Sequence, residues 1–364
     1  MKTLFCIYFF LWSILLCAQD QMFVHTATAT SISDNKTYID HPDLNMNPDA
    51  KIVITHNWNP LGSTGVYNIN VTGVLYDTIE EKWAIQNEDS AIPMIENSSY
   101  NIYVARADEV IEHIATTANQ GTGPFYTVLD HPLLNETPSR KIVFSTYYNP
   151  NQVYNRKRYG MFYDEINLDR VIYTENFSNI PVNSAFFVVI EGDNVQSLRH
   201  EATPQNITNN RTVIDHPHLN NNPNAVIIFS HNWGIAGDAS NVIIDKVMGV
   251  QYIDDQWAIF TEDQSPMPED AKFDVIINAA PLYVNENQLL NLSVYPNPVI
   301  DFVSITSEEN ISKLNIYNLR GNLVLTSEEN STTVKLDLSE LSGGIYFSEI
   351  FSEGKKKTLK LIKQ

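Results

Sequence analysis

Apolar and polar residues alternate along this chain in short runs with a period of two, and no stretch carries an apolar stripe at helical spacing. Such alternation is typical of half-buried β-strands. The pair of runs between Gly73 and Glu88 predicts a hairpin whose turn falls in residues 77–81. We therefore expect an all-β protein. The strands predicted in the first part of the chain lie near residues 24–30, 36–40, 51–58, 72–77, 82–88 and 99–105.

The same pattern occurs three times. Asp-His-Pro begins at residues 40, 130 and 215, and each copy is followed by a Leu-Asn pair, a proline and an apolar strand. A fixed period is the signature of a repeat protein, and six short strands per copy predict a small β-sandwich or barrel, with a β-propeller as the alternative. The short links between copies predict that neighbours touch, in a rigid rod. We place the three tandem β-repeats at 19–106, 107–193 and 194–280.

The first 18 residues have the parts of a secretory signal peptide. Lys2 precedes an apolar run from Leu4 to Leu16, and Ala18 stands before a polar segment. The run is shorter than the roughly 20 apolar residues of a membrane span, and no other stretch approaches that length, so we expect no transmembrane segment. Acylation of Cys17, as in a lipoprotein, is the alternative.

Residues 289–364 form a separate β-module after a linker at 281–288, with Pro-Asn-Pro, Arg-Gly-Asn and Ser-Gly-Gly turns and a lysine-rich end. Tyr-Pro-Asn-Pro at Tyr295, Ile-Tyr-Asn-Leu-Arg-Gly at Ile316 and Gly-Ile-Tyr-Phe at Gly344 resemble the C-terminal sorting domain of type IX secretion cargo in Bacteroidota. The resemblance implies an Ig-like β-sandwich, a periplasmic intermediate, and recognition by the type IX machinery. It also implies export to the cell surface or the medium, commonly with removal of the domain.

The three repeats resemble an uncharacterised repeat of secreted bacterial proteins, built from Asp-His-Pro, His-Asn-Trp, Gly-Val-x-Tyr and Trp-Ala-Ile elements. The first and third copies match it closely, and the second departs at His-Asn-Trp and Trp-Ala-Ile. This resemblance brings no activity, so function has to be argued from the residues.

Composition removes several classes of function. With 43 acidic against 23 basic residues, the formal charge is −20, which disfavours binding to nucleic acid. The only cysteines, Cys6 and Cys17, lie in the signal segment, so no thiol remains for a disulfide, a cysteine-ligated zinc or a nucleophile. No nucleophile elbow, His-Glu-x-x-His helix, phosphate loop or dinucleotide turn is present, so we expect no enzyme activity and no cofactor.

Residues that repeats 1 and 3 share and repeat 2 lacks are the candidates for a ligand site, because the fold tolerates their loss. Exposed indoles beside amides and carboxylates are typical of sugar sites. The alternative is that the tryptophans are core residues. In repeat 2 the matching positions are assigned to Thr146, Tyr147 and Tyr148, to Val171, and to Asn176 and Phe177. The candidate ligand-binding residues are His56, Asn57, Trp58, Trp83, Asp89, His231, Asn232, Trp233, Trp257 and Asp263.

Metal sites are not expected. Eight of the nine histidines occupy repeat positions, but the Asp-His-Pro histidines belong to separate repeats, so scaffold roles explain them better. Asp43, Asn45, Asn47 and Asp49 alternate as in a calcium loop, yet the sister repeats lose the carboxylates, which favours an Asn-Pro turn.

These observations predict an exported, non-catalytic surface or secreted repeat protein that binds a glycan or another surface ligand. The alternatives are a structural or adhesive coat protein without a small ligand and, less favoured, a glycan-active enzyme that uses paired carboxylates such as Glu88 and Asp89.

Overall fold

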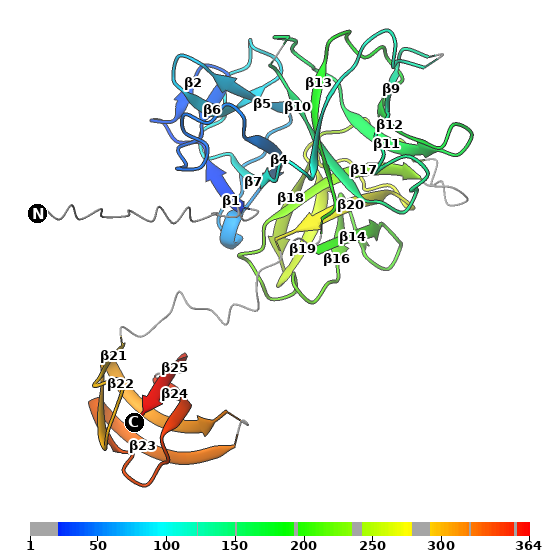
Figure 1. The fold of residues 1–364 in the computed structure, drawn as a ribbon. Coiled ribbons are helices and arrows are strands. Elements are labelled where there is room, and N and C mark those ends of the chain that lie inside the picture. Colours follow the sequence, from blue (N-terminus) through cyan, green and yellow to red (C-terminus); the bar gives the residue numbers. More distant parts are fainter. Residues whose placement is uncertain are drawn as a thin grey trace, which may run out of the picture. The chain divides into compact units, whose positions relative to one another are not determined.

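The structure is a computed structural model that describes residues 21–121, 123–149, 151–192, 196–234, 242–278, 292–319, 322–352 and 355–364. The predicted signal peptide and linker lie outside these residues. The chain divides into two compact units, Met1–Ala280 and Pro281–Gln364 (Figure 1). The all-β prediction is confirmed, since the described residues hold strands and one 3₁₀ turn, η1 (Pro60–Gly62). Among the described residues, no helix is long and apolar enough to cross a membrane.

Repeat 1 has the predicted strands to within a few residues, together with the short strand β2. The hairpin β5–β6 pairs Gly73 with Gln86 and turns between Asp77 and Lys82, as expected. Its strands are β1 (Gln21–Thr26), β2 (Ile32–Ser33), β3 (Lys36–Tyr38), β4 (Lys51–Asn57), β5 (Thr72–Asp77), β6 (Lys82–Asn87) and β7 (Ser99–Ala105).

The other two repeats follow the same order of strands. Repeat 2 contains β8 (Val110–Ile114), β9 (Tyr126–Leu129), β10 (Ile142–Tyr147), β11 (Tyr159–Asp164), β12 (Asp169–Thr174) and β13 (Ala185–Ile190). Repeat 3 contains β14 (Gln196–Glu201), β15 (Ile207–Thr208), β16 (Arg211–Ile214), β17 (Ile227–Gly234), β18 (Met248–Ile253), β19 (Gln256–Thr261) and β20 (Lys272–Ile277).

Each sheet of this unit is built from two repeats. β4 of repeat 1 pairs in parallel with β18 of repeat 3, β10 of repeat 2 with β5 of repeat 1, and β17 of repeat 3 with β11 of repeat 2. The resulting sheets have the orders β1-β7-β4-β18-β19-β16-β15, β2-β3-β6-β5-β10-β13-β8 and β14-β20-β17-β11-β12-β9. Every repeat therefore joins both others, and the three close into a ring about a pseudo-three-fold axis. The expected rod is wrong, because its ends pair with each other.

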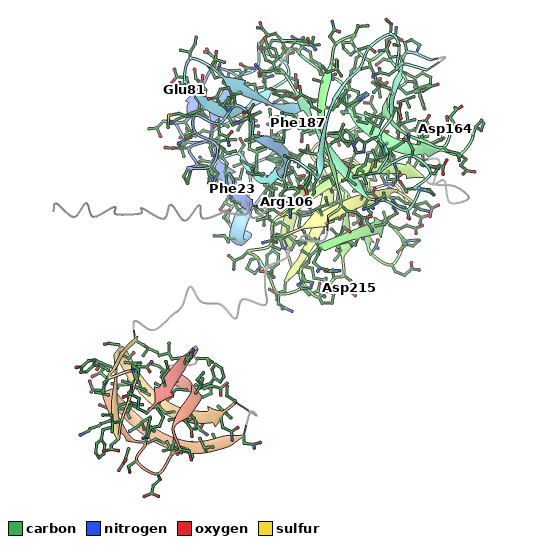
Figure 2. All side chains as sticks on the ribbon, in the orientation of Figure 1. Phe23, Glu81, Arg106, Asp164, Phe187 and Asp215 are labelled. Atoms are coloured by element: carbon green, nitrogen blue, oxygen red, sulfur yellow. The ribbon has the colours of Figure 1, made fainter. Side chains whose placement is uncertain are left out.

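The hydrophobic cores also cross the repeat boundaries. The core around Trp83 includes Val143, Phe187 and Val189 from repeat 2 as well as Ile228 from repeat 3. Figure 2 shows Phe187 inside the ring, whereas Glu81, Asp164 and Asp215 lie at its outer edge. Burial of apolar area supplies most of the folding free energy. A single repeat would expose part of this core, so the ring folds as one body.

The C-terminal unit is a five-stranded antiparallel β-structure. The strand order is β21-β22-β24-β25, and β23 pairs with β22. Its core includes Val303, Leu314, Ile350 and Leu361. The strands are β21 (Leu292–Tyr295), β22 (Phe302–Asn318), β23 (Leu323–Asp337), β24 (Gly344–Ser352) and β25 (Lys355–Lys363).

Candidate functional site

Three buried glutamates join the repeats to one another. Glu88, Glu175 and Glu262 follow β6, β12 and β19, and we call them the interface glutamates. Each is at most 2% exposed. One carboxylate oxygen of each accepts a backbone N–H from the next repeat: Asn155 N–H to Glu88 (2.7 Å), Ile244 N–H to Glu175 (2.9 Å) and Asn68 N–H to Glu262 (3.0 Å).

The second carboxylate oxygen of each interface glutamate contacts a side chain of β17, β4 or β10 in another repeat. His231 Nδ1 lies 2.6 Å from Glu175, His56 Nδ1 contacts Glu262, and in the third interface Thr146 Oγ1 donates to Glu88 (2.8 Å). The Nε2 atoms of both histidines are buried and have no hydrogen-bond partner among the described residues. The carboxylate is therefore what compensates the burial of each imidazole.

In the interface that contains Thr146, the pKa of the buried glutamate is raised. Burial raises the pKa of Glu88 to about 7, against the lowering effect of its hydrogen bonds from Asn155 and Thr146. No imidazole faces this carboxyl group. The pKa of this buried carboxyl group therefore lies near neutral pH.

Asn57 and Asn232, the second residues of the His-Asn-Trp elements, are buried in the same interfaces. Asn57 Nδ2 donates to Asn101 Oδ1 (2.8 Å), and Asn101 Nδ2 donates to the carbonyl oxygen of Ile227 in repeat 3 (2.9 Å). Asn232 Nδ2 donates to Asp274 Oδ1 (3.2 Å). These bonds give both asparagines a structural contact.

Repeat 2 replaces this polar arrangement with aromatic packing. At the position of Asn57 it has Tyr147, whose ring stacks on Phe187 with centroids 4.1 Å apart. The loss of His-Asn-Trp from repeat 2 therefore has a packing explanation.

Two assignments between repeats were wrong. The register pairs Tyr163 with Arg170, just as Tyr76 pairs with Trp83, so Arg170 and not Val171 replaces the tryptophan. Likewise Glu175, not Asn176, matches Glu88. Gly73 and Glu88 are 15 residues apart, as are Gly160 and Glu175, and this spacing was the signal that could have shown the match.

Trp83 and Trp257 are both 0% exposed. Their Nε1 atoms donate to the carbonyl oxygens of Asn47 and Asn222, each at 2.8 Å. In repeat 2, the buried Arg170 donates to the carbonyl oxygens of Pro138 and Arg140 at the corresponding place. These contacts close the Asn-Pro turn onto the core and give the tryptophans a packing role. A role in binding stays a prediction.

Trp58 and Trp233 are half-buried at repeat interfaces. Trp58 lies against Phe260 of repeat 3, with ring centroids 6.5 Å apart, and Trp233 lies against Phe162 of repeat 2, at 5.7 Å. Gly65 backs the indole of Trp58 so closely that a Cβ there would clash with it. One face of Trp58 is therefore already covered.

The acidic candidates are held by ion pairs near the ring surface. Asp89 Oδ1 lies 3.1 Å from Arg156 Nη2 of repeat 2, and Asp263 Oδ2 lies 2.5 Å from Lys246 Nζ. Desolvation acts to raise the pKa of Asp263, but the hydrogen bonds from Lys246 and Ser265 lower it to about 2. Asp263 is therefore charged at neutral pH. The structure thus does not gather the ten candidates into one site.

The remaining histidines support the scaffold. His25, His113 and His200 contact Thr37, Thr127 and Thr212 through Nε2 at 2.7–2.9 Å, and burial lowers the pKa of each to about 4. The Asp-His-Pro aspartates accept Nδ2–H of Asn45, Asn135 and Asn220. Among the residues that the structure describes, no three His, Cys, Asp or Glu side chains are grouped as a metal site.

Two exposed tyrosines were not among the residues predicted from the sequence. Tyr67 and Tyr154 precede Asn68 and Asn155 at equivalent positions and are 38% and 36% exposed. Tyr67 packs against Trp58 with centroids 5.4 Å apart, and Tyr154 packs against Tyr148 at 4.8 Å. We call these the two aromatic pairs. Repeat 2 therefore also presents an aromatic surface.

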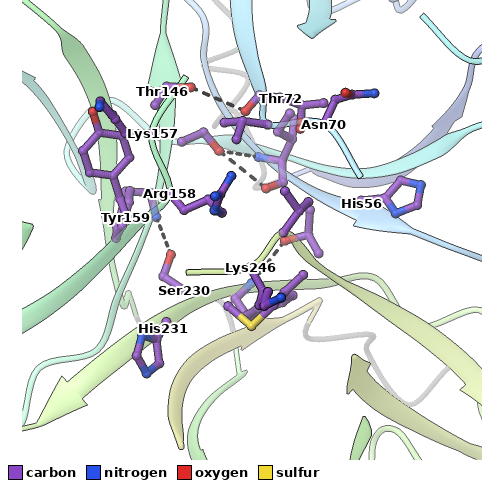
Figure 3. Close-up of a pocket in the computed structure, with 18 of the residues that line it drawn as sticks. His56, Asn70, Thr72, Thr146, Lys157, Arg158, Tyr159, Ser230, His231 and Lys246 are labelled. Atoms are coloured by element: carbon purple, nitrogen blue, oxygen red, sulfur yellow. Dashed lines mark hydrogen bonds between the residues drawn. The ribbon is translucent and has the colours of Figure 1, made fainter. Parts of the chain in front are cut away.

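A cavity of about 160 Å³ lies where the three repeats meet on the pseudo-three-fold axis, and we call it the axial pocket (Figure 3). Three hydroxyls surround it in a cyclic pattern. Ser145 accepts Ile54 N–H (2.9 Å), Ser230 accepts Phe144 N–H (3.0 Å) and Thr55 accepts Phe229 N–H (3.2 Å). These bonds hold the central strands β4, β10 and β17 together.

Sequence comparison assigns most of the chain. Residues 10–104, 73–167 and 160–277 match the family described as domain of unknown function (DUF7452), and residues 293–364 match the secretion system C-terminal sorting domain. No curated protein matches the chain.

Solved structures give weaker matches. PorZ, described as an essential bacterial surface component of the type-IX secretion system of Porphyromonas gingivalis, is 14% identical with a TM-score of 0.19. This match covers 57% of the present chain and 25% of that chain. A biofilm associated protein BSP domain is 10% identical with a TM-score of 0.19, covering 95% and 81% of the respective chains. Scores this low carry no argument about fold or function.

Proposed function

Since the chain belongs to the DUF7452 family, a domain of unknown function, and carries a C-terminal sorting domain, it is an exported type IX secretion protein of the cell surface or the medium, and we propose that it is a non-catalytic glycan-binding protein. The sorting domain would bring the ring into contact with extracellular polymers.

The two aromatic pairs carry this proposal. The outer rings, Tyr67 and Tyr154, are partly exposed, and each is backed by an inner ring, Trp58 or Tyr148, that packs in the interface. A supported ring with a free face is the surface on which the apolar C–H face of a sugar stacks. Because the pairs sit at equivalent positions of one ring, their separation is fixed, and a polymer that reaches both would gain avidity.

This proposal moves the predicted binding surface. Of the original candidates it keeps Trp58 as a supporting aromatic ring, and it adds repeat 2, in which the sequence analysis placed no candidate residue. His56 and His231 contact glutamates of a neighbouring repeat, whereas the side chains of Asn57 and Asn232 bond to residues of their own repeats. Those contacts favour the second candidate, a structural coat protein whose ring serves only as a rigid block.

The test is retention of the whole chain on immobilised polysaccharides, comparing wild type with Tyr67→Ala, Tyr154→Ala and the double variant. Loss of one stacking contact of about 1 kcal/mol weakens binding roughly tenfold at most. Phe177→Ala is the matched control, because it removes an exposed aromatic side chain that lies outside the two aromatic pairs. Retention that is unchanged in the double variant would favour the coat protein.

A further inference from the structure

The lining of the axial pocket departs from the acidic character of the chain. Its lining residues include Lys157, Arg158 and Lys246 and, among the described residues that line it, no aspartate or glutamate. The whole chain has 43 acidic and 23 basic residues. Carboxylates behind the lining balance part of this charge: the interface glutamates contact His56, Thr146 and His231, Asp245 pairs with Arg158, and Asp263 pairs with Lys246.

The cations lie at equivalent positions of the repeats, but not every repeat has a cation at these positions. Asn70, Lys157 and Lys246 each lie three residues before the glycine of β5, β11 or β18, and Val71, Arg158 and Val247 come next. All three repeats have a hydroxyl residue at the equivalent scaffold position: Thr55, Ser145 and Ser230. Of these six pocket-lining positions, three hold a cation and the other three hold Asn or Val. The fold therefore does not require a cation at these positions.

These cations retain donors for a ligand. Lys157 has no hydrogen-bond or ion-pair partner within the described part of the chain. Arg158 contacts Asp245 Oδ1 through Nε (2.6 Å), a bond that leaves the two Nη groups outside the pair. Lys246 pairs with Asp263 at the surface. Figure 3 shows Arg158 toward the middle of the view of the pocket.

The size of the pocket limits the ligand. A volume of about 160 Å³ holds several water molecules but is smaller than the roughly 300–1,000 Å³ of pockets for drug-sized ligands. A planar guanidinium beside an ammonium matches the geometry of carboxylate, sulfate or phosphate oxygens. Asn70 and Thr72 add polar groups beside the cations.

We propose that the axial pocket is a binding site for a compact anion, a carboxylate, sulfate or phosphate group, held by Lys157 and Arg158 with Lys246 at its edge. The ligand reaches this site as a free oxoanion or as one acidic residue of a sugar. The proposal does not depend on the aromatic pairs, because it rests on different residues.

The test is calorimetric titration of the whole chain at low ionic strength with sodium phosphate, sodium sulfate and glucuronate, and with glucose as the neutral counterpart. We expect at least one of the anions to bind and glucose not to bind. Binding of phosphate or sulfate identifies a free oxoanion as sufficient, whereas binding of glucuronate alone identifies an acidic sugar. Glucose binding as tightly as the anions, or no binding of any anion at millimolar concentration, overturns the proposal.

Three variants locate the site. Lys157→Gln and Arg158→Gln should each weaken the anion at least tenfold while the melting temperature stays within a few degrees of wild type. Arg156→Gln is the matched control, because it removes the same charge two residues away but pairs with Asp89 outside the pocket lining, and it should change affinity by less than threefold. Equal weakening by all three variants would show a general charge effect and overturn the site.

The same variants separate this site from the proposed glycan surface. Tyr67→Ala and Tyr154→Ala should leave anion affinity unchanged. Loss of polysaccharide binding in those variants with intact anion binding, or the reverse in Lys157→Gln, would show that the two sites stand or fall independently.

Discussion

Replacing an interface glutamate by glutamine should destabilise the ring where a histidine faces it. In Glu175→Gln and Glu262→Gln, the new amide oxygen still accepts the N–H of Ile244 or Asn68, but the charge beside the buried imidazole is gone. Removing one partner of a buried ion pair costs about 3–5 kcal/mol, and the retained bond places these variants near 3 kcal/mol. For a ring of this size, that is a fall in melting temperature of roughly 6–12 °C.

Glu88→Gln is the matched control, because Thr146 and not a histidine faces it. The folded-state pKa of Glu88 is raised to about 7 by burial, whereas the unfolded value is 4.5. The stability due to its neutral carboxyl group is therefore fully present below pH 4.5 and is lost as pH rises through 7. Glutamine stays neutral, so the variant should gain on wild type with rising pH, by at most about 3 kcal/mol at pH 8.

The assay is urea unfolding followed by tryptophan fluorescence at pH 5, 6, 7 and 8. Apart from Trp12, all tryptophans lie in the ring and none in the sorting domain, so the signal reports the ring alone. The pKa values of His25, His113 and His200 are lowered, so their titration changes stability in the opposite direction to that of Glu88. Comparing each variant with wild type at the same pH cancels this contribution. Equal losses in Glu88→Gln and Glu262→Gln at pH 8 would refute the charge argument.

Three further predictions follow from the fold. Trp83→Ala should cost about 3–5 kcal/mol in thermal melts, because this indole is fully buried, whereas Tyr67→Ala should cost under about 1 kcal/mol. Excised repeat 2, residues 107–193, should lack dispersed amide signals in NMR spectra, since β10 and β11 lose their partner strands; a folded spectrum would contradict this. After deletion of residues 289–364, cell fractionation should find the chain inside the cell. Export at the normal level would contradict the sorting role of these residues.

The strands were predictable because period-two alternation is a local property. β4, β5 and β7 lie within one residue of the predicted ranges 51–58, 72–77 and 99–105. Closure of the ring was not predictable, because it depends on pairings between residues nearly 200 positions apart, such as Asn57 with Val250. No local pattern encodes such a register.

The site was predicted less well for a related reason. Absence of His-Asn-Trp from repeat 2 was interpreted as freedom from structural constraint, yet it has a packing reason: the Thr146 hydroxyl donates to Glu88 across the interface, and Tyr147 stacks on Phe187 within repeat 2. The cations of the axial pocket are scattered in sequence over repeats 2 and 3. Only the three-fold packing brings Lys157, Arg158 and Lys246 to one cavity.

Cross-linking of repeat 1 to repeat 3 tests the closed ring most directly. Leu61 in η1 and Asp254 after β18 are both exposed, and a Cβ at Gly62 would lie 3.7 Å from the ring of Tyr252, so cysteines at 61 and 254 fall within reach of a short bismaleimide. With Cys6 and Cys17 replaced by serine, no other thiol competes. The closed ring predicts a 61–254 cross-link within monomeric chains, identified by mass spectrometry. A monomer fraction without that link, in which both cysteines react singly, would contradict it.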